Sequence, residues 1–447
     1  MSEHSSRREQ RRRRRMITQL VAYGAVAVVL LLIGLGVTLL IKYFKNAGNS
    51  APSPAAQVET ETSSQESSSD EYVLYINEEE TSEAETETET ETEEETTVDL
   101  LEEVVRDCID DMPIEDKVAG LFIITPEQLT GVDTVLQAGD GTKEALDKYH
   151  IGGLIYFDKN IKSEEQLTEM ITNTKAFSKY PLFIAVDEEL GDVARLRKGL
   201  NLDPIQSAAD IGAANDASKA YEAYNSIGKY MIKYGFNLDF APVSDVLLNA
   251  DNKAIGNRSF GSDEAIVSSM VDSSVRGLKD AGVTACLKHF PGQGAVNSDT
   301  HEGVALLDRS EAEIDSVELK PFLAGIEAGA DMIMVGHMTV PQITQDNVLP
   351  ASLSKEIITD LLREKYQYEG VVITDALNMA AVSDYYSADE AAIKALKAGA
   401  DMILMPEDFV LAYEGVLKAV DEGVISEQRI NDSLARVYRI KYRATVE

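Results

Sequence analysis

The sequence predicts a (β/α)8 barrel, and three observations carry that prediction. Short apolar runs rich in β-branched residues recur after residue 98, and segments with helical periodicity separate them, as in a parallel sheet wrapped by helices. Polar residues follow these runs directly, where the mouth of a barrel lies. The Gly-rich phosphate turn of an open doubly wound sheet is missing after the first run. The eight predicted strands are Gly120 to Thr125, Gly152 to Phe157, Leu182 to Val186, Asn237 to Pro242, Ala285 to His289, Met332 to Val335, Gly370 to Thr374 and Met402 to Met405.

The polar residues at the strand ends have side chains suited to acid–base or nucleophilic chemistry. Because the strands of a parallel barrel all end at one mouth, we expect these side chains to converge on one pocket. In chain order they are Asp187 and Glu188 after the third strand, Asp245 after the fourth, His289 at the end of the fifth, His337 after the sixth and Asp375 after the seventh.

The first 41 residues predict a membrane anchor. Ile17 to Ile41 is an apolar run without a charged side chain, and a bilayer core needs about 20 helical residues. Seven arginines precede the run and only Lys42 and Lys45 follow it closely, which predicts a cytoplasmic tail at residues 1–15, a transmembrane helix at 16–41 and an extracellular remainder. A cleaved signal peptide is the alternative, but the run is longer than a typical h-region and no A-x-A site follows.

Residues 42–97 predict a disordered linker. From Ala51 to Thr97 the composition is rich in Ser, Thr and Glu, with sixteen acidic residues and no lysine or arginine. Such a segment buries too little apolar surface to offset its chain entropy, so an extended, self-repelling tether is expected. The remaining residues, 98–447, are long enough for one independently stable domain.

The charge and the cysteines exclude some classes of protein. The 447-residue chain has a formal net charge of -36, and nucleic acid is therefore excluded as a partner, since phosphate binding requires a basic face. Cys108 and Cys286 match no C-x-x-C metal or redox pattern. Both are interpreted as buried small hydrophobes.

The segment from Lys288 to Gly294, together with Asp299 and His301, carries the strongest indication of chemistry. Glycines and a proline beside charged residues predict a shaped loop over a pocket. Asp299 and His301 are two residues apart, so a turn lets the carboxylate accept a hydrogen bond from the imidazole. That contact orients the histidine and raises its pKa, which suits a general acid and base near neutral pH.

Asp375 directly follows the apolar run Val371 to Thr374, which places a carboxylate at the barrel mouth. Such a group can attack an anomeric carbon, as the nucleophile of a retaining glycosidase does. Taken alone, an Asp after a strand is more often a helix N-cap. Glu188 and His337 likewise have a structural and a functional interpretation, and the sequence does not choose between them.

Together these segments resemble family 3 glycoside hydrolases, specifically the single-domain bacterial β-N-acetylhexosaminidases. The resemblance extends over about Asp99 to Arg443. The matching features are Val186-Asp-Glu-Glu189 with Arg195, Asn237-Leu-Asp-Phe-Ala-Pro-Val243 with Asp245, Ile255-Gly-Asn-Arg-Ser-Phe-Gly261, the loop from Lys288, and Thr374-Asp-Ala-Leu-Asn-Met379.

The resemblance implies a retaining β-N-acetylhexosaminidase that removes terminal β-linked N-acetylglucosamine from cell-wall or related glycans. It implies that Asp375 is the nucleophile and that His301, oriented by Asp299, is the acid and base. No metal or organic cofactor is implied, because a carboxylate and an imidazole supply the chemistry. The residues implied to bind the sugar are Asp187, Arg195, Arg258, Lys288 and His289.

The sequence departs from the family pattern at three positions. Where the pattern runs Asp-Gln/Glu-Glu-Gly-Gly-Arg, the chain has Leu190 for the first glycine and Asp192 for the arginine. Leu190 is expected to add bulk beside the sugar, and Asp192 reverses a charge. Gln293 stands where the family usually has a histidine. We expect the chemistry to be retained, whereas the three departures leave the substrate preference open.

Three rival functions remain open from the residues. The first is a metal-dependent barrel hydrolase using His289, His301 and His337, although Phe122-Ile-Ile-Thr-Pro126 stands where such barrels carry an H-x-H pair. The second is a non-catalytic, membrane-anchored sugar-binding scaffold or sensor. The third is a β-glucosidase, or a phosphorylase that transfers the glycosyl intermediate to phosphate.

Overall fold

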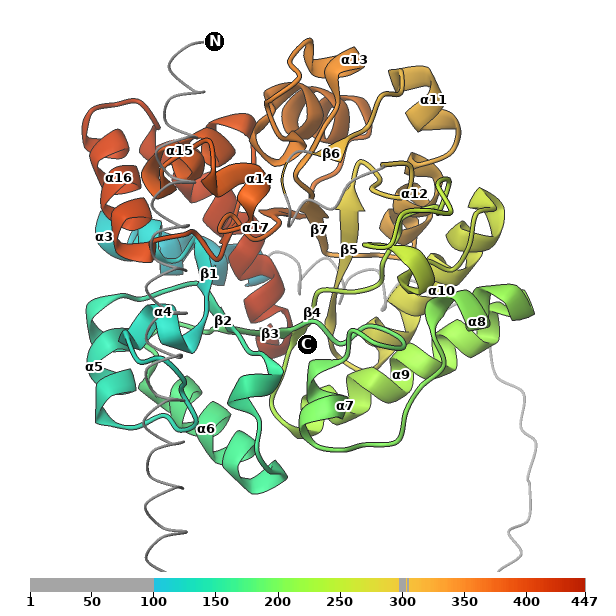
Figure 1. The fold of residues 1–447 in the computed structure, drawn as a ribbon. Coiled ribbons are helices and arrows are strands. Elements are labelled where there is room, and N and C mark those ends of the chain that lie inside the picture. Colours follow the sequence, from blue (N-terminus) through green and yellow to red (C-terminus); the bar gives the residue numbers. More distant parts are fainter. Residues whose placement is uncertain (1–99, 297–302, 304, 447) are drawn as a thin grey trace, which may run out of the picture. The chain divides into compact units, whose positions relative to one another are not determined.

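The computed structural model describes residues 100–296, 303 and 305–446 (Figure 1). Eight parallel strands form one sheet in the order β10-β1-β2-β3-β4-β5-β7-β9. Ile373 of β9 makes a parallel bridge with Met402 beside β10, which brings the two ends of the sheet together into a nearly closed barrel. The strands are β1 (Phe122–Ile124), β2 (Gly153–Ile155), β3 (Phe183–Val186), β4 (Leu238–Asp239), β5 (Thr284–Phe290), β7 (Met332–Val335), β9 (Val371–Thr374) and β10 (Ile403–Leu404).

Helices surround this sheet on its outer side (Figure 1). A first helix covers residues 100–110. The others are α3 (Ile114–Ala119), α4 (Pro126–Thr130), α5 (Asp140–Lys148), η1 (Asp158–Asn160), α6 (Glu164–Phe177), α7 (Arg195–Gly199), α8 (Ala208–Ala214), α9 (Ala217–Lys233), η2 (Gly256–Arg258), α10 (Glu264–Asp280), α11 (Glu311–Ser316), α12 (Leu319–Glu327), α13 (Pro341–Thr344), η3 (Ala351–Leu353), η4 (Glu356–Lys365), α14 (Ala380–Ser383), α15 (Ala388–Ala398), α16 (Phe409–Asp421) and α17 (Glu427–Val446).

Two separate apolar clusters follow from the alternation of side chains along each strand. The larger one lies between the sheet and the helices and includes residues from Val105 to Tyr438. The smaller one fills the barrel, because alternate strand residues point inward. Its buried members are Ile123, Ile155, Phe183, Ala185, Leu238, Phe240, Cys286, Met332, Met334, Val371, Ile373, Met402, Leu404 and Val437.

A second, two-stranded parallel sheet was not predicted from the sequence. It consists of β6 (Ala305–Leu306) and β8 (Met338–Thr339), with Ala305 opposite Met338. The Leu307 N–H extends the pairing by donating to the Thr339 carbonyl at 2.9 Å. The β6 strand thereby joins the chain to the segment that directly follows β7.

The helix α17 closes the end of the barrel opposite the carboxyl ends of the strands. Val437 belongs to the cluster inside the barrel, and Lys441 Nζ donates to the Gly152 carbonyl at 2.7 Å. The same ammonium lies 4.9 Å from the centre of the Phe183 ring. Its burial lowers the pKa of Lys441 to about 7.

The structure tests the predictions for the two cysteines but not those for the anchor and the linker. Both cysteines are free; Cys286 is buried as predicted, whereas Cys108 is only half-buried, with its sulfur 3.3 Å from Tyr442 Oη. The predicted anchor at 16–41 and the linker at 42–97 lie outside the described residues. Within residues 100–296, 303 and 305–446, no helix is both long enough and apolar enough to cross a bilayer.

Candidate active site

A cavity of about 290 Å³ lies at the carboxyl ends of the barrel strands. Six of the eight predicted site residues border it, and Asp299 and His301 lie outside the described residues. The lining residues are Ile155, Phe157, Asp187, Glu189, Val193, Arg195, Ala254, Arg258, Lys288, His289, Gln293, Met334, Asp375, Ala376, Asn378, Met379, Leu404 and Met405.

The inward alternation of the strands explains why these polar side chains reach the cavity. Ala185 on β3 points into the barrel, so Asp187 and Glu189 continue on the same side beyond the strand end. Cys286 on β5 points inward in the same way, and Lys288 is two residues further on. The strands β3 and β5 therefore place these polar side chains two or four residues beyond an apolar residue that fills the barrel.

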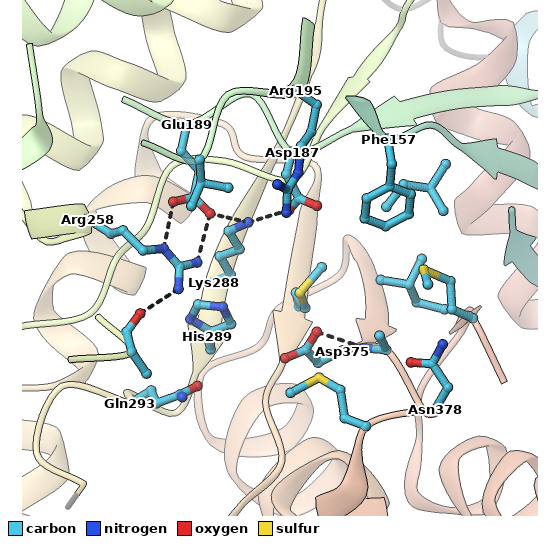
Figure 2. Close-up of a pocket in the computed structure, with 18 residues that line it drawn as sticks. Phe157, Asp187, Glu189, Arg195, Arg258, Lys288, His289, Gln293, Asp375 and Asn378 are labelled. Atoms are coloured by element: carbon cyan, nitrogen blue, oxygen red, sulfur yellow. Dashed lines mark hydrogen bonds and ion pairs between the residues drawn. The ribbon is translucent and has the colours of Figure 1, made fainter. Parts of the chain in front are cut away.

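Lys288 and Arg258 are held by carboxylates from the end of β3 (Figure 2). Lys288 Nζ lies 2.7 Å from Asp187 Oδ1 and 2.6 Å from Glu189 Oε1. The Arg258 guanidinium donates to both oxygens of Glu189 at 2.8 Å and to the Ala254 carbonyl at 2.8 Å. Two cations and two carboxylates thus form one network, in which the fork of the arginine fixes the orientation of Glu189.

The charges of this network stabilise one another. Burial raises the pKa of Glu189, but the positive charges of Lys288 and Arg258 outweigh it and lower that pKa to about 2. Burial lowers the pKa of Lys288, and the carboxylates of Asp187 and Glu189 more than reverse this. Glu189 and Lys288 are therefore both charged near neutral pH, and the network presents fixed donors and acceptors to the cavity.

Asp375 stands at the end of β9, two residues beyond the inward-pointing Ile373. Its Oδ1 accepts a hydrogen bond from the Ala376 N–H at 2.7 Å (Figure 2). Burial raises the pKa of Asp375, but the fields of His337 and His289, together with the Ala376 hydrogen bond, outweigh it and lower that pKa below its ordinary value. Asp375 is therefore an ionised carboxylate at the cavity wall, as a nucleophile requires.

His289 is oriented by a buried carboxylate. Its Nδ1 lies 2.8 Å from Asp245 Oδ2, and Asp245 is fully buried. Asp245 also accepts from the Gln293 N–H at 2.5 Å, which ties the loop to the same anchor. Because a carboxylate only accepts, Nδ1 carries the proton and Nε2 is the nitrogen left to meet a ligand.

Arg195 is the cation of the cavity that no carboxylate in the described chain holds. Its backbone N–H donates to the Asp187 carbonyl at 3.2 Å, and its guanidinium lies 5.6 Å from the centre of the Phe157 ring. The buried Nε has no hydrogen-bond partner among the described residues. Such a donor is available to a polar ligand.

Glu188 and His337 have structural roles and do not line the cavity. Glu188 points away from the barrel interior, and its carboxylate accepts from the N–H groups of Leu196 and Arg197 and from Tyr230 Oη. His337 Nε2 donates to the Ala376 carbonyl at 2.9 Å and thereby supports the segment that carries Asp375.

The expectation for Leu190 is wrong. Its side chain is 1% exposed and belongs to the apolar cluster outside the barrel, because it alternates away from the cavity after Glu189. Asp192 is exposed, and its carbonyl accepts from Lys198 Nζ at 2.5 Å. Of the three departures from the family pattern, only Gln293 borders the cavity.

Sequence reasoning missed several lining residues. Glu189 was quoted within a motif but given no role, although its position two residues after Asp187 on an alternating strand places both on the same face. Asn378 and Met405 were also missed as lining residues. Their places depend on how the segment after β9 pairs with the end of β10, which no local pattern in the sequence reports.

The metal-dependent alternative depended on His289, His301 and His337. His289 and His337 are engaged with Asp245 and with Ser352 and the Ala376 carbonyl, respectively. Across the part of the chain that the structure describes, no group of three His, Cys, Asp or Glu residues is arranged to hold a metal ion.

A polar cavity at the carboxyl ends of a parallel barrel is typical of barrel enzymes, and the density of charged donors and acceptors suits a polyhydroxylated ligand. The chain belongs to glycosyl hydrolase family 3: the model of the glycosyl hydrolase family 3 N-terminal domain matches residues 114–440. The family resemblance inferred from the sequence motifs is therefore confirmed.

The chain is also similar to named relatives and to a solved structure. Beta-hexosaminidase A of Pseudoalteromonas piscicida is 32% identical over 326 residues, which cover 67% of this chain and 54% of that protein. Beta-hexosaminidase of Hydrogenovibrio crunogenus is 34% identical over 64% of this chain and 81% of that protein. The family 3 beta-N-acetylglucosaminidase of Paenibacillus sp. str. FPU-7 is 36% identical with a TM-score of 0.70, over 75% of this chain and 63% of that one. The chain thus spans about half the length of the first of these relatives.

Proposed function

We propose that this chain is a retaining glycoside hydrolase that releases terminal, non-reducing β-linked N-acetylglucosamine. The observation that carries the proposal is the ionised Asp375 carboxylate at the wall of a cavity whose neighbouring wall holds the Lys288, Arg258 and Glu189 network. Cleavage of a sugar acetal requires a nucleophilic carboxylate beside a pocket of charged, hydrogen-bonding groups.

In the proposed reaction, Asp375 attacks the anomeric carbon and forms an ester with the sugar. The glycosidic bond breaks, and the leaving oxygen takes a proton from His301, which Asp299 orients. Water then attacks the same carbon, loses a proton to His301 and releases the Asp375 carboxylate, so the product keeps the β configuration. The roles of His301 and Asp299 rest on the family resemblance.

The fixed charges of the cavity supply binding of the sugar hydroxyls. Asp187 and Lys288 offer an acceptor and a donor at one place, and His289 adds Nε2. A site built from such groups rejects a ligand that lacks the matching hydroxyl, because buried donors would be left unpaired. The choice of N-acetylglucosamine is supported by the names of the relatives, which are beta-hexosaminidases and a beta-N-acetylglucosaminidase.

We also propose that residues 16–41 anchor the chain in the cell membrane with the barrel outside. The support is the uncharged apolar run from Ile17 to Ile41, with seven arginines before it. The acidic linker would let the barrel reach glycan beyond the membrane surface. Cell-wall glycan is accordingly the proposed source of the substrate.

The test uses residues 98–447 with 4-nitrophenyl β-N-acetylglucosaminide and the matching β-glucoside. We expect turnover of the first sugar, with the released N-acetylglucosamine initially in the β form by proton NMR. Preference for the glucoside, or faster turnover with added phosphate, would assign the chain to the other activities of such a site. Sugar binding without turnover of either substrate would indicate a scaffold instead.

A further inference from the structure

The cavity divides into a polar arc and an apolar arc, and the strand order shows where each lies. The cations and carboxylates of the network, with His289, come from the neighbouring units of β3, β4 and β5. The arc formed by β7, β9, β10 and β2 contributes mostly apolar side chains. These are Ile155, Phe157, Met334, Ala376, Met379, Leu404 and Met405.

Asp375 and Asn378 interrupt the apolar arc. Figure 2 shows Asn378 beside Asp375 and away from the charged network of Glu189, Arg258 and Lys288. The Asn378 side chain is exposed to the cavity mouth and forms no hydrogen bond with any part of the described chain. Its amide therefore offers an NH₂ donor group and a carbonyl acceptor within an otherwise apolar surface.

Met405 is held in an unusual backbone conformation next to Asn378. Its φ of 43° lies in the left-handed region that favours glycine. The Met405 N–H donates to the Ile123 carbonyl at 2.9 Å, and the Met405 carbonyl accepts from the Asn378 N–H at 3.0 Å. These bonds fix the strained residue, and its long side chain borders the cavity. Met405 combines this backbone conformation with a side chain that borders the cavity, and this combination points to a function for the side chain.

We propose that Met405 and Asn378 recognise the acylamino group on carbon 2 of the sugar. Attack by Asp375 fixes carbon 1 above that carboxylate, and carbon 2 is bonded to carbon 1. In the proposed orientation, the hydroxyls on carbons 3 and 4 extend toward the polar arc, whose charged groups suit them, and the substituent of carbon 2 lies against the apolar arc that carries Met405 and Asn378. The methyl group packs against the Met405 thioether, and the amide pairs with Asn378.

This assignment rests on the proposed function and adds the feature that separates N-acetylglucosamine from glucose. Glucose carries a hydroxyl at carbon 2 and has no methyl group there to pack against Met405. Glucose therefore gains little binding free energy from the apolar arc. Loss of a single apolar contact of this size changes discrimination by about 10- to 200-fold. The acyl group is thus recognised by the β9–β10 side, whereas Arg258 and Lys288 act on both sugars alike.

The test compares Met405→Ala, Met405→Gly and Asn378→Ala with the wild-type chain on 4-nitrophenyl β-N-acetylglucosaminide and the β-glucoside. We expect the ratio of kcat/KM for the two sugars to fall at least about tenfold in each variant, mainly through KM for the N-acetyl sugar. Met405→Gly should melt at a higher temperature than Met405→Ala, since glycine relieves the left-handed backbone.

Gln367→Gly is the matched control. Gln367 also has a positive φ, of 53°, but it is exposed and does not line the cavity. The Gln367→Gly variant should keep or gain thermal stability and leave the ratio of kcat/KM for the two sugars unchanged. A general effect of relieving backbone strain is thereby separated from an effect on sugar recognition.

Calorimetric binding of free N-acetylglucosamine and glucose distinguishes this inference from the proposed function. If the wild type binds N-acetylglucosamine without turnover and the variants lose that binding, recognition stands and hydrolysis fails. If the wild type turns the N-acetyl sugar over and no variant changes the ratio by more than about threefold, hydrolysis stands and the assignment of Met405 and Asn378 is overturned. A wild type without selectivity for the N-acetyl sugar in either measurement overturns both.

Discussion

Glu189 Oε1 lies 2.6 Å from Lys288 Nζ, and each of these side chains is only 2% exposed. Glu189 also receives both donors of the Arg258 fork, so it is the shared counterion of two buried cations. A neutral side chain in its place would leave excess positive charge in a site that water hardly reaches. The consequences can be measured separately in stability and in catalysis.

Glu189→Gln should lower the free energy of unfolding by about 3 kcal/mol, the scale expected when one partner of a buried ion pair is lost. Its KM for the chromogenic sugar should rise, because Lys288 and Arg258 lose their common anchor. Urea unfolding and steady-state kinetics measure the two effects. The control is Glu164→Gln, which removes the exposed pair with Lys233 and should cost much less stability than Glu189→Gln, because solvent screens that pair. Equal losses in the two variants would contradict a special role for Glu189.

The same carboxylate predicts how stability depends on pH. The pKa of Glu189 is lowered from 4.5 to about 2 in the folded protein, so folding favours its ionised form. This contributes about 3 kcal/mol above pH 4.5, and the contribution is lost as the pH falls toward 2. Unfolding free energies of the wild type and Glu189→Gln, measured from pH 7 to pH 2, should therefore converge on the acid side. Parallel curves would show that Glu189 has no part in acid denaturation.

Asp375→Ala should abolish hydrolysis, with kcat lowered at least about 10⁴-fold, because no other carboxylate takes its place as nucleophile. Azide can enter the space left by the side chain, so we expect it to restore formation of a glycosyl azide. Activity is followed by nitrophenol release and the product by NMR. Circular dichroism confirms folding, and a folded variant with more than a tenth of wild-type kcat would remove Asp375 from the reaction.

His301→Ala and Asp299→Ala test the proton transfers, which rest on family resemblance for residues outside the described range. Loss of a general acid slows substrates with poor leaving groups most. We expect both variants to lose about 10²-fold or more on a disaccharide substrate and far less on a dinitrophenyl sugar. A loss independent of the leaving group would assign these residues to binding.

Deletion of residues 51–97 tests the proposed tether. We expect unchanged turnover of a soluble chromogenic sugar and reduced release of N-acetylglucosamine from intact cell wall, because reach and not chemistry is altered. The full chain should sediment with membranes, and a chain beginning at residue 98 should not. Equal loss on both substrates would argue against a function in reach.

The fold was largely predictable because the strands of the barrel correspond to short apolar runs in the sequence. Seven of the eight strands of the nearly closed sheet fall within the predicted runs, and β5 (Thr284–Phe290) extends one residue beyond its run at each end. The runs are apolar on both faces because one face fills the barrel and the other meets helices. The β6 and β8 pair escaped prediction, because it forms outside the alternation of strands and helices that builds the barrel. The cytoplasmic tail and anchor remain predictions.

A residue of the candidate site was predictable where the alternation along its own strand sets its position. It was not predictable where hydrogen bonds between two separate segments set that position. Asp187, Lys288 and Asp375 each lie two residues beyond an inward-facing residue, so local alternation places them at the mouth. Leu190 was misplaced because this alternation was not applied to it. Met405 could not be assigned, because its position depends on hydrogen bonds to β1 and to the segment after β9.

The pairing of β1 with β10 also sets the order in which the domain can be completed. The first strand of the barrel, Phe122–Ile124, receives one of its two neighbours only when Ile403–Leu404 has been synthesised, almost 280 residues later along a chain of 447. Until then one edge of β1 exposes unpaired backbone groups to other chains. Ribosome-bound chains therefore carry an open sheet until this last strand emerges, and during that interval the edge of β1 is a site for aggregation.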